Sequence, residues 1–452
     1  MYAVVDCDNC FVSCERVFQP QLKGRPVVVL SNNDGCVVAR SNEAKALGVK
    51  MGVPIYQIMD QVEAQGIQIR SSNYPLYADM SNRVMSILRN PPVCLQDVPE
   101  ARDAGTDTSS ELQEPTFVSA FEQYSIDEAF LTGSFTRPWA EALVRLVYQW
   151  TGMPVSVGIG PTRTLAKAAT WFAKHYPGYN KVCIIATDEQ REKALRLLEV
   201  GEVWGVGWRS VDKYKYYGIQ TAYDLTLRSA SWVQQHFTIT GLRTWKELRG
   251  EDCIQTLLTG RRQTICTSRS FEKMVSELGE MEMYVGNFAQ HCAQKLRKER
   301  SAASMVTCWI QTNHFREDLM QYDPSLTLPL DVASNSNFDI VGAALRALRC
   351  IWREGYHYKR AGVIVSGISS ANGVQLNLFD SLSIEERQRR DKLSAFMDEI
   401  NRKYGTDTIQ MGVQQFPSDS LNGKAISYKD LLKHDYRSRC YTTNLDDVIE
   451  VQ

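Results

Sequence analysis

Short apolar segments that favour β-strands alternate with segments of helical periodicity at the start of the chain. The pattern predicts strands at 2–5 and 27–30 and helices at 11–18, 41–47 and 77–88. Asp6 directly follows the first strand, and a single carboxylate there is most simply an N-cap or turn residue before the helix. A functional role for Asp6 therefore requires partners from elsewhere in the chain.

The pattern is interrupted at residues 91–123, which carry four prolines and seven acidic residues but one basic residue. We expect a solvated loop inserted into a domain there. Beyond it the sequence predicts a hairpin at 121–134, a helix at 139–150, a strand at 155–159 and a helix from Thr164. Strands and helices alternate without a strict βαβ repeat, which favours an α+β sheet layered with helices.

The chain becomes helical from 189 to 250, and this part contains VWGVGWRSVDKYKYYGI. Gly205 and Gly207 flank a turn between two short predicted helices and Lys213 follows, which is typical of a helix-hairpin-helix. In that motif glycines let backbone N–H groups approach a phosphate, and the start of a helix favours negative charge. The alternative is an ordinary helix–helix turn.

A separate α+β unit is predicted at 264–368, after a boundary near 251–262. Its basic residues would gather on faces suited to a nucleic-acid backbone, although charge runs are usually only solvated helix faces. These residues are Arg297, Lys298, Arg300, Arg346, Arg349, Arg353, Lys359 and Arg360.

The composition is that of a folded protein of several domains. The 452 residues are 44% hydrophobic and 23% charged with a formal net charge of −1, so any affinity for nucleic acid must come from local basic patches. The chain contains neither a membrane-length apolar window nor a secretion signal, so we expect a cytoplasmic protein. The 12 scattered cysteines indicate reduced thiols, and Cys7-x-x-Cys10 alone is weak support for zinc.

Two adjacent carboxylates, Asp127 and Glu128, lie in the otherwise apolar predicted hairpin. Like charges so close are costly unless a cation neutralises them. With Asp6 they make three oxygen ligands on neighbouring strands, which suit two Mg²⁺ ions about 3.5–4 Å apart. Such a site serves polymerases and other enzymes of nucleotidyl transfer.

Six motifs then occur in the order and spacing of one enzyme family: MYAVVDCDNCF, SNNDGCVVARSNEAKALGVKMG, NYPLYADMSNRVM, YSIDEAF, VGIGPTRTLAKAA and VWGVG. Over residues 1–380 the chain resembles the Y-family DNA polymerases, and within them the UmuC-type bacterial branch. The predicted insert at 91–123 exceeds the short connection of that branch.

The resemblance implies a role for individual residues around the carboxylates. Asp6, Asp127 and Glu128 would be the metal ligands, with Cys7 adding its backbone carbonyl. Phe11 looks like the steric gate that excludes a ribose 2′-hydroxyl, and a core aromatic is the alternative. The other residues expected to contact the nucleotide are Val38, Asn42, Lys45 and Lys174, where Asn42 replaces a tyrosine found in many members.

The resemblance also implies an α+β, multidomain, right-hand polymerase. The expected domains are a palm (1–10 and 79–187), fingers (11–78), a thumb with the helix-hairpin-helix (188–258), a little finger (264–368) and a C-terminal tail (369–452). Residues Gly205, Gly207 and Lys213 would contact DNA. In the tail, Gln375, Leu376, Leu378 and Phe379 look like the peptide by which bacterial polymerases bind the sliding clamp.

The expected function is error-prone, template-directed translesion synthesis in the SOS response to DNA damage. Its implied partners are primer–template DNA, deoxynucleoside triphosphates, the sliding clamp, an accessory protein dimer of the UmuD type and a RecA-type recombinase filament. One alternative is a non-catalytic, clamp-tethered DNA-binding scaffold with structural carboxylates. Another is a different two-metal nucleotidyl transferase such as a nucleotide cyclase, which would not need residues 190–368.

Overall fold

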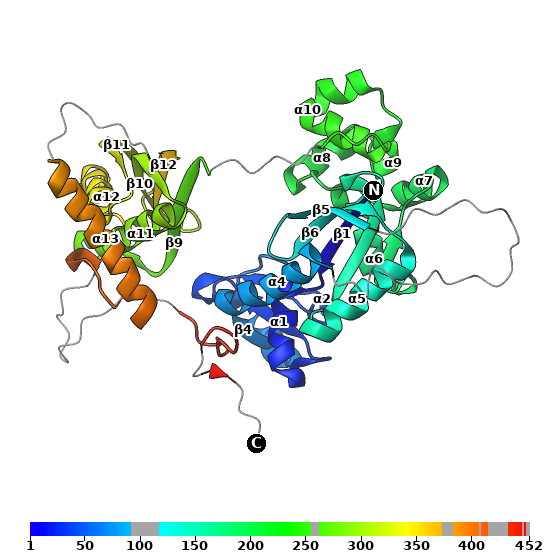
Figure 1. Cartoon of the computed structure of the whole chain (residues 1–452), viewed down its shortest axis with the longest axis horizontal. Helices are drawn as coiled ribbons and strands as arrows, with labels where there is room; N and C mark the ends of the chain where they lie inside the picture. The colour runs from blue at the N-terminus through cyan, green and yellow to red at the C-terminus, as the bar shows by residue number, and fades with distance from the viewer. Residues whose placement is uncertain are drawn as a thin grey trace, which may run out of the picture. The chain divides into compact units, whose positions relative to one another are not determined.

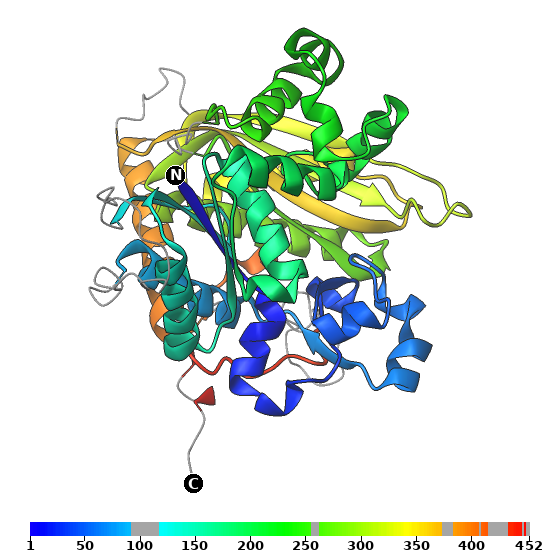
Figure 2. The same cartoon turned by 90° about the vertical axis from the view of Figure 1, so that its right-hand side faces the viewer.

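The computed structural model describes residues 1–91, 117–254, 262–372, 383–405, 408–414, 433–444 and 447–448 (Figures 1 and 2). The chain forms two compact units. The first comprises Met1–Ser31, Gly35–Thr256 and Tyr436–Gln452, and the second comprises Asn32–Asp34 and Leu257–Asp435. Among the helices that are described, none has both the length and the apolar character needed to cross a membrane.

A five-stranded sheet forms the centre of the first unit (Figure 1). Its strands, in spatial order, are β5 (Phe117–Gln123), β6 (Glu128–Ser134), β1 (Tyr2–Cys7), β7 (Val155–Gly160) and β8 (Val182–Ile184). The first strand of the chain therefore lies in the middle and pairs antiparallel with both neighbours. Central strands are covered on both faces, which explains why β1 is almost uniformly apolar before Asp6.

Helices cover the two faces of this sheet. Because side chains alternate along a strand, Ala3 and Val5 face one side, where they join a core with residues of α4 (Tyr74–Arg89) and α5 (Arg137–Thr151). Val4 faces the other side and packs with Ala166 of α6 (Arg163–His175). The end of β1 is thereby placed under α6.

The prediction of a loop over the whole of 91–123 is wrong for residues 117–123, which form β5. Residues 92–116 lie outside the described part of the chain. Val118 and Phe121 pack against the core, and the Arg89 guanidinium lies 5.1 Å from the centre of the Phe121 ring. Pairing with β6 satisfies backbone groups of residues 117–123, and composition alone did not indicate that pairing.

A smaller sheet and three short helices follow β1. The sheet has the order β3 (Val37–Arg40), β2 (Val27–Leu30) and β4 (Gln68–Ser71), and the helices are α1 (Cys10–Phe18), α2 (Asn42–Ala46) and α3 (Met59–Gln65). Ser41 caps α2 by accepting a hydrogen bond from the Ala44 N–H group. The expected helix at 41–47 is therefore confirmed and shorter than predicted.

The helical part of the first unit contains α7 (Asp188–Leu197), α8 (Trp208–Tyr216), α9 (Ala222–Thr226) and α10 (Ala230–Leu248). Its core is continuous with α6, because Leu165 and Phe172 of α6 belong to the same apolar cluster. Capping boxes at Thr187 and Thr221 fix the starts of α7 and α9.

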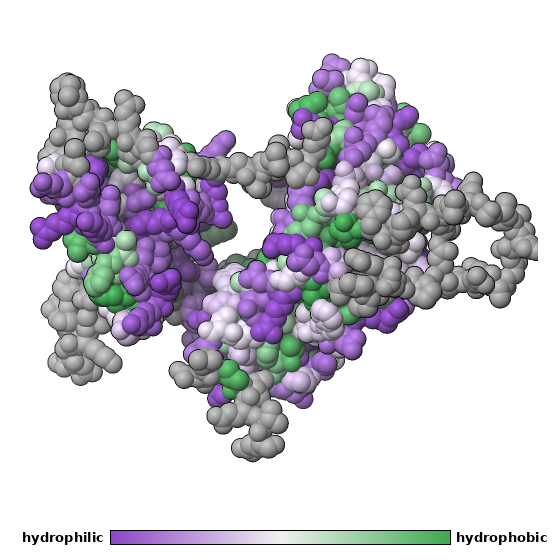
Figure 3. All heavy atoms as spheres, viewed as in Figure 1, coloured by the Kyte–Doolittle hydropathy of each residue, from purple (hydrophilic) through white to green (hydrophobic). Residues whose placement is uncertain are grey.

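The second unit has its own sheet and core. The antiparallel strands have the order β11 (Ser325–Ser334), β10 (Ser301–Thr312), β12 (Tyr358–Ser370) and β9 (Thr264–Val275). Two helices share this core, α11 (Leu278–Lys298) and α12 (Asn337–Ile351), and α13 (Ile384–Tyr404) packs on α12. Hydrophilic residues dominate the face of this unit drawn in Figure 3, with a smaller hydrophobic area over α13.

Candidate active site

Asp6 and Glu128 are brought together by strand register. They lie directly opposite each other in the antiparallel pair of β1 and β6. Both side chains are on the face that Val4 and Phe130 present to α6, because successive side chains alternate between faces. Opposite residues in such a pair have Cβ atoms about 4.5–5.5 Å apart, so the two carboxylates interact directly.

Two lysines of α6 neutralise these carboxylates. The Lys174 ammonium lies 2.5 Å from Asp6 Oδ1, and the Lys167 ammonium lies 2.5 Å from Glu128 Oε1. The lysines are two helical turns apart and therefore share a face of α6. The four side chains are largely buried, which strengthens the attraction between the opposite charges.

The pKa values of the two carboxyl groups are pushed apart. Burial raises the pKa of Asp6 to about 8; the Lys174 charge opposes this rise and the neighbouring Glu128 adds to it. Burial also acts against ionisation of Glu128, but its hydrogen bond with Asp6 and the Lys167 charge lower its pKa below the usual value. The pair therefore holds one proton more readily than two exposed carboxylates would.

Asp127 and Cys7 complete this end of the sheet. The Cys7 N–H group donates to the Asp127 carbonyl at 2.8 Å, and the Ser125 hydroxyl donates to Asp127 Oδ1 at 2.5 Å. The Asp127 side chain lines the cavity described below, while Glu128 is held by Lys167. Within the described ranges, no three His, Cys, Asp or Glu side chains are arranged closely enough to hold a metal ion.

The donor chemistry of the site nevertheless fits a divalent cation. Carboxylate oxygens are the ligands that Mg²⁺ prefers, and three carboxyl groups gather at one end of the sheet. Burial raises the pKa of Asp6, and a cation bound beside the three carboxyl groups would favour their ionised forms. Asp6, Asp127 and Glu128 are the residues that would hold such an ion.

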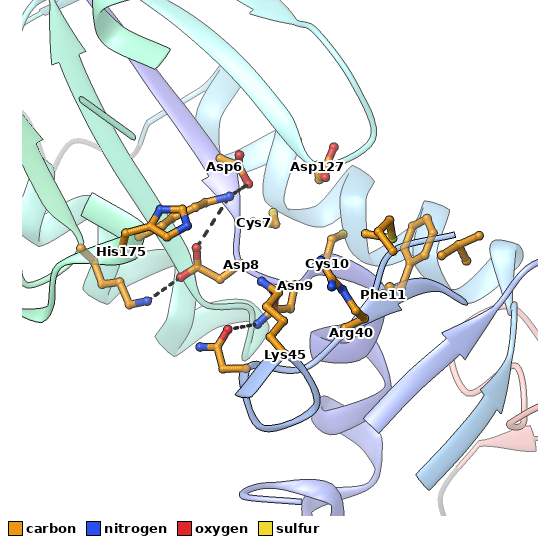
Figure 4. A pocket seen from close by; sticks show the side chains of 16 residues that line it. Asp6, Cys7, Asp8, Asn9, Cys10, Phe11, Arg40, Lys45, Asp127 and His175 are labelled. Atoms are coloured by element: carbon orange, nitrogen blue, oxygen red, sulfur yellow. Dashed lines mark hydrogen bonds and ion pairs between the residues drawn. The ribbon is translucent and has the colours of Figure 1, made fainter. Parts of the chain in front are cut away.

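A cavity of about 410 Å³ opens beside the carboxylates (Figure 4). Asp6, Asp8 and His175 lie on one side of it, and Arg40 and Phe11 lie on the other. The other lining residues are Cys7, Asn9, Cys10, Val38, Ala39, Asn42, Lys45, Met51, Asp127, Lys174 and Lys181. The cavity thus has an acidic end and, beyond it, a wall of basic, amide and apolar side chains.

The basic wall comes from residues that are far apart in the sequence. Lys45 of α2 donates to Asn9 Oδ1 at 2.7 Å, and the Asn9 amide donates to Asn42 Oδ1 at 3.0 Å. Burial and the nearby charges of Arg40 and Lys174 lower the pKa of Lys45. These three cations therefore lie close together around the cavity. This field favours a polyanion such as a triphosphate.

Phe11 forms part of an aromatic group at the edge of the cavity. Its ring stacks on Tyr77 with 4.6 Å between centroids and 15° between planes, and meets the edge of Tyr74 at 5.9 Å. Phe11 is half-buried, so one part of the ring faces the cavity. Val38, also half-buried, lines the same cavity with a small side chain.

Sequence reasoning assigned no role to several residues of the site. Asp8 accepts hydrogen bonds from Ser156 and Lys181, at 2.8 and 2.9 Å, and is 4.0 Å from Lys174. It anchors two cations beside the cavity. Lys167 could have been found from its spacing to Lys174 on one helix, whereas Arg40 carries no local signal because its position depends on the fold of the small sheet.

The glycines of the predicted helix-hairpin-helix turn lie between a short 3-10 helix, Val200–Glu202, and α8. Gly205 has a φ of +91°, which favours glycine, and Gly207 is the N-cap of α8. A side chain on Gly207 would meet no atom within 4 Å, so its surroundings are open. The Lys213 ammonium, in contrast, donates to the His236 carbonyl at 2.5 Å within the helical region.

Some basic residues of the second unit are engaged within it. Arg297 makes two hydrogen bonds with Asp398 of α13, at 2.6 and 2.8 Å, and Arg349 binds Glu282 at 2.7 Å. Other basic residues of the second unit are exposed on or just after helices α11 and α12, among them Lys298, Arg300 and Arg346. Residues Gln375, Leu376, Leu378 and Phe379 lie outside the described part of the chain.

Comparison with known sequences identifies relatives over the whole chain. Residues 5–171 match the impB/mucB/samB family, residues 262–378 match its C-terminal domain, and residues 391–451 match a domain of unknown function. Protein ImpB of Salmonella typhimurium is 35% identical over 99% of both chains, and protein UmuC of the same species is 35% identical over all of both. DNA polymerase IV of Corynebacterium diphtheriae is 26% identical over 81% of this chain and 75% of its own.

Solved structures share the fold at lower identity. A Y-family DNA polymerase chimera of Dbh and Dpo4 covers 82% of this chain and 100% of its own with a TM-score of 0.60 and 20% identity. An insertion ternary complex of Dbh DNA polymerase has the same coverage and identity with a TM-score of 0.51.

Proposed function

This chain belongs to the impB/mucB/samB family of Y-family DNA polymerases, and from that premise we infer that it catalyses template-directed, error-prone translesion DNA synthesis. The role in the SOS response that was expected from the sequence fits the similarity to UmuC. The relative named DNA polymerase IV supports the same reaction.

One structural observation carries the proposal for the active site. Asp6 and Glu128 face each other across two central strands, Asp127 lies at the adjoining turn, and a basic cavity begins beside them. Nucleotidyl transfer requires acidic groups at the reacting phosphate and cations along the rest of the triphosphate. A purely structural role would not explain why buried carboxylates and lysines converge on a cavity.

We assign the residues of this site by their chemistry. Asp6, Asp127 and Glu128 would hold the two Mg²⁺ ions, which supply charge neutralisation and Lewis acidity to phosphoryl transfer. Lys45, Arg40 and Lys174 would bind the triphosphate, and Asn42 would donate a further hydrogen bond. Phe11 would pack against the sugar, and Val38 would leave room above the nascent base pair.

A non-catalytic DNA-binding scaffold is not favoured. It would require neither the buried carboxylate pair nor the cavity, and two of the basic residues predicted for DNA contacts in the second unit are bound to carboxylates. A nucleotide cyclase would not need a helix-hairpin-helix or the second unit. The polymerase assignment accounts for all of these parts together.

The partners follow from the same assignment. Primer–template DNA and deoxynucleoside triphosphates are the substrates. We propose in addition a UmuD-type dimer, a RecA-type filament and the sliding clamp. The similarity to UmuC supports the first of these, and the sequence of residues 375–379 supports the last.

Primer extension tests the proposal directly. The full chain is incubated with Mg²⁺, the four deoxynucleotides and a primer on templates that carry each normal base or an abasic site. We expect templated insertion opposite the normal bases and some extension past the lesion. Insertion that ignores the template, or no insertion in the presence of the proposed accessory proteins, would contradict a polymerase. Insertion that survives replacement of both Asp6 and Glu128 by Ala would contradict the site.

A further inference from the structure

The C-terminal strap, residues 436–444, lies against the first unit beside α1 and β4 (Figure 1). The Tyr436 N–H group donates to the Ser71 hydroxyl at 3.0 Å, and the Ser71 N–H group donates to the Tyr436 carbonyl at 3.2 Å. The Asn73 amide donates to the carbonyl and the hydroxyl of Ser438, at 3.1 and 2.9 Å. The strap is therefore attached through specific polar contacts at its beginning.

An aromatic pair attaches the other end of the strap. The Tyr441 ring stacks on Phe18 with 4.9 Å between centroids and 8° between planes. The Gln19 amide donates to the Tyr441 hydroxyl at 3.3 Å. Phe18 is the last residue of α1, the helix whose second residue is Phe11. The Tyr441 end of the strap thus contacts the helix that carries Phe11.

A buried carboxylate connects the strap to the interior. Glu15 of α1 is fully buried, and its Oε1 atom accepts hydrogen bonds from Ser438 at 3.0 Å and from Tyr77 at 2.7 Å. Its other oxygen, Oε2, has no hydrogen-bond partner among the described residues. Burial raises the pKa of Glu15, and the hydrogen bonds from Tyr77 and Ser438 oppose this rise. The strap supplies one of the two donors that hold Glu15 in place.

Tyr77 connects Glu15 to a residue that lines the cavity. Its hydroxyl is bound to Glu15, its ring is fully buried, and the ring stacks on Phe11, which lines the cavity. An uninterrupted series of contacts therefore runs from Ser438 through Glu15 and Tyr77 to Phe11. Packed side chains of this kind transmit small displacements because interiors have few voids.

We propose that the C-terminal strap sets the position of Phe11, so that the strap is a determinant of sugar selection although it does not touch the nucleotide. The inference rests on the proposed function of Phe11. It gives a purpose to part of the domain of unknown function that matches residues 391–451. Ser438, Glu15 and Tyr77 act as positioning residues in this account.

The test compares the insertion of a deoxynucleotide and the matching ribonucleotide by the full chain. The variants are Ser438→Ala and Tyr77→Phe, which each remove one donor to Glu15, with Thr443→Ala as the control because its side chain on the strap is exposed. The measured quantity is the ratio of kcat/KM values for the two nucleotides. Misfolded protein lowers both values equally and cancels from this ratio.

We expect Ser438→Ala and Tyr77→Phe to lower the deoxy-over-ribo ratio about three- to tenfold, and Thr443→Ala to leave it unchanged. In a Phe11→Ala background the effect of Ser438→Ala should disappear, because both changes act through one contact. If Phe11→Ala changes the ratio and the strap variants do not, the strap has no such role. If Phe11→Ala itself leaves the ratio unchanged, the proposed role of Phe11 fails first.

Discussion

At the scale of single residues, each buried carboxylate of the site is stabilised by a lysine of opposite charge. Asp6 and Glu128 would repel strongly without Lys174 and Lys167, since all four side chains are largely buried. Each lysine offsets the charge of one carboxylate, and burial still raises the pKa of Asp6.

Loss of one carboxylate should stop nucleotide addition. We expect Asp127→Asn or Glu128→Gln to reduce the single-turnover rate of insertion by about a hundredfold or more, because several kcal/mol of transition-state stabilisation would be lost. Binding of primer–template DNA should change little. Glu63→Gln, at an exposed position of α3, serves as the matched control. A variant that keeps a tenth of the original rate would exclude its carboxylate from the metal site.

Phe11→Ala should admit ribonucleotides. The smaller side chain would remove the proposed clash with the 2′-hydroxyl, so kcat/KM for a ribonucleotide should rise about tenfold or more relative to the deoxynucleotide. The measurement is single-nucleotide insertion with both sugars on one template. If selectivity is unchanged while the thermal stability falls, Phe11 only packs against Tyr74 and Tyr77.

At the scale of elements, the sequence predicted individual helices and strands better than it predicted the contacts between them. The strand at 2–5, the hairpin at 121–134 and the helix at 139–150 were predicted from local periodicity, and the structure confirms them with slightly wider bounds. The opposition of Asp6 and Glu128 could not be predicted, because register between distant strands depends on the whole sheet. The strap was also missed, since a polar segment gives no periodic signal of its contacts.

The contact between β7 and α6 depends on Gly158. A Cβ atom there would lie 2.1 Å from the Thr170 backbone nitrogen and 2.4 Å from the Ala166 carbonyl oxygen, so α6 would have to move. We expect Gly158→Ala to cost about 1–3 kcal/mol of unfolding free energy, measured by denaturant titration. Gly178→Ala, where nothing lies within 4 Å, is the control. Insertion should fall more than the folded fraction does, because α6 carries Lys167 and Lys174.

The predicted helix-hairpin-helix turn can be tested without disturbing the fold. Gly207→Val adds a side chain where no atom lies within 4 Å and φ is −75°, whereas Gly205→Val forces a residue into the left-handed region. We expect Gly207→Val to weaken binding of primer–template DNA and to reduce the dependence of affinity on salt. Gly205→Val should show the same loss together with lower stability. Unchanged affinity and salt dependence in Gly207→Val would mean that this turn does not contact DNA.

At the scale of the whole molecule, the net charge does not attract DNA. The formal net charge is −1, so attraction to the phosphate backbone must come from separate basic places such as the cavity wall and the exposed ends of α11 and α12. Scattered contacts of this kind give modest, salt-sensitive binding. An enzyme of this type gains from a tether that raises its local concentration at the primer end.

The segment 373–382, between β12 and α13 in the sequence, contains the predicted clamp-binding peptide. Leu378 and Phe379 would fill an apolar pocket of the clamp while Gln375 forms a hydrogen bond at its rim. We expect replacement of Leu378 and Phe379 by Ala to abolish binding to the clamp and to shorten the products made on clamp-loaded template. Synthesis without the clamp should be unchanged, and Asn377→Ala, directly before the two anchors, should behave like the original protein. Persistent clamp binding would refute the assignment, and so would an equal loss of clamp-free synthesis, because tethering affects how long the enzyme stays on DNA and leaves the chemistry at the carboxylates untouched.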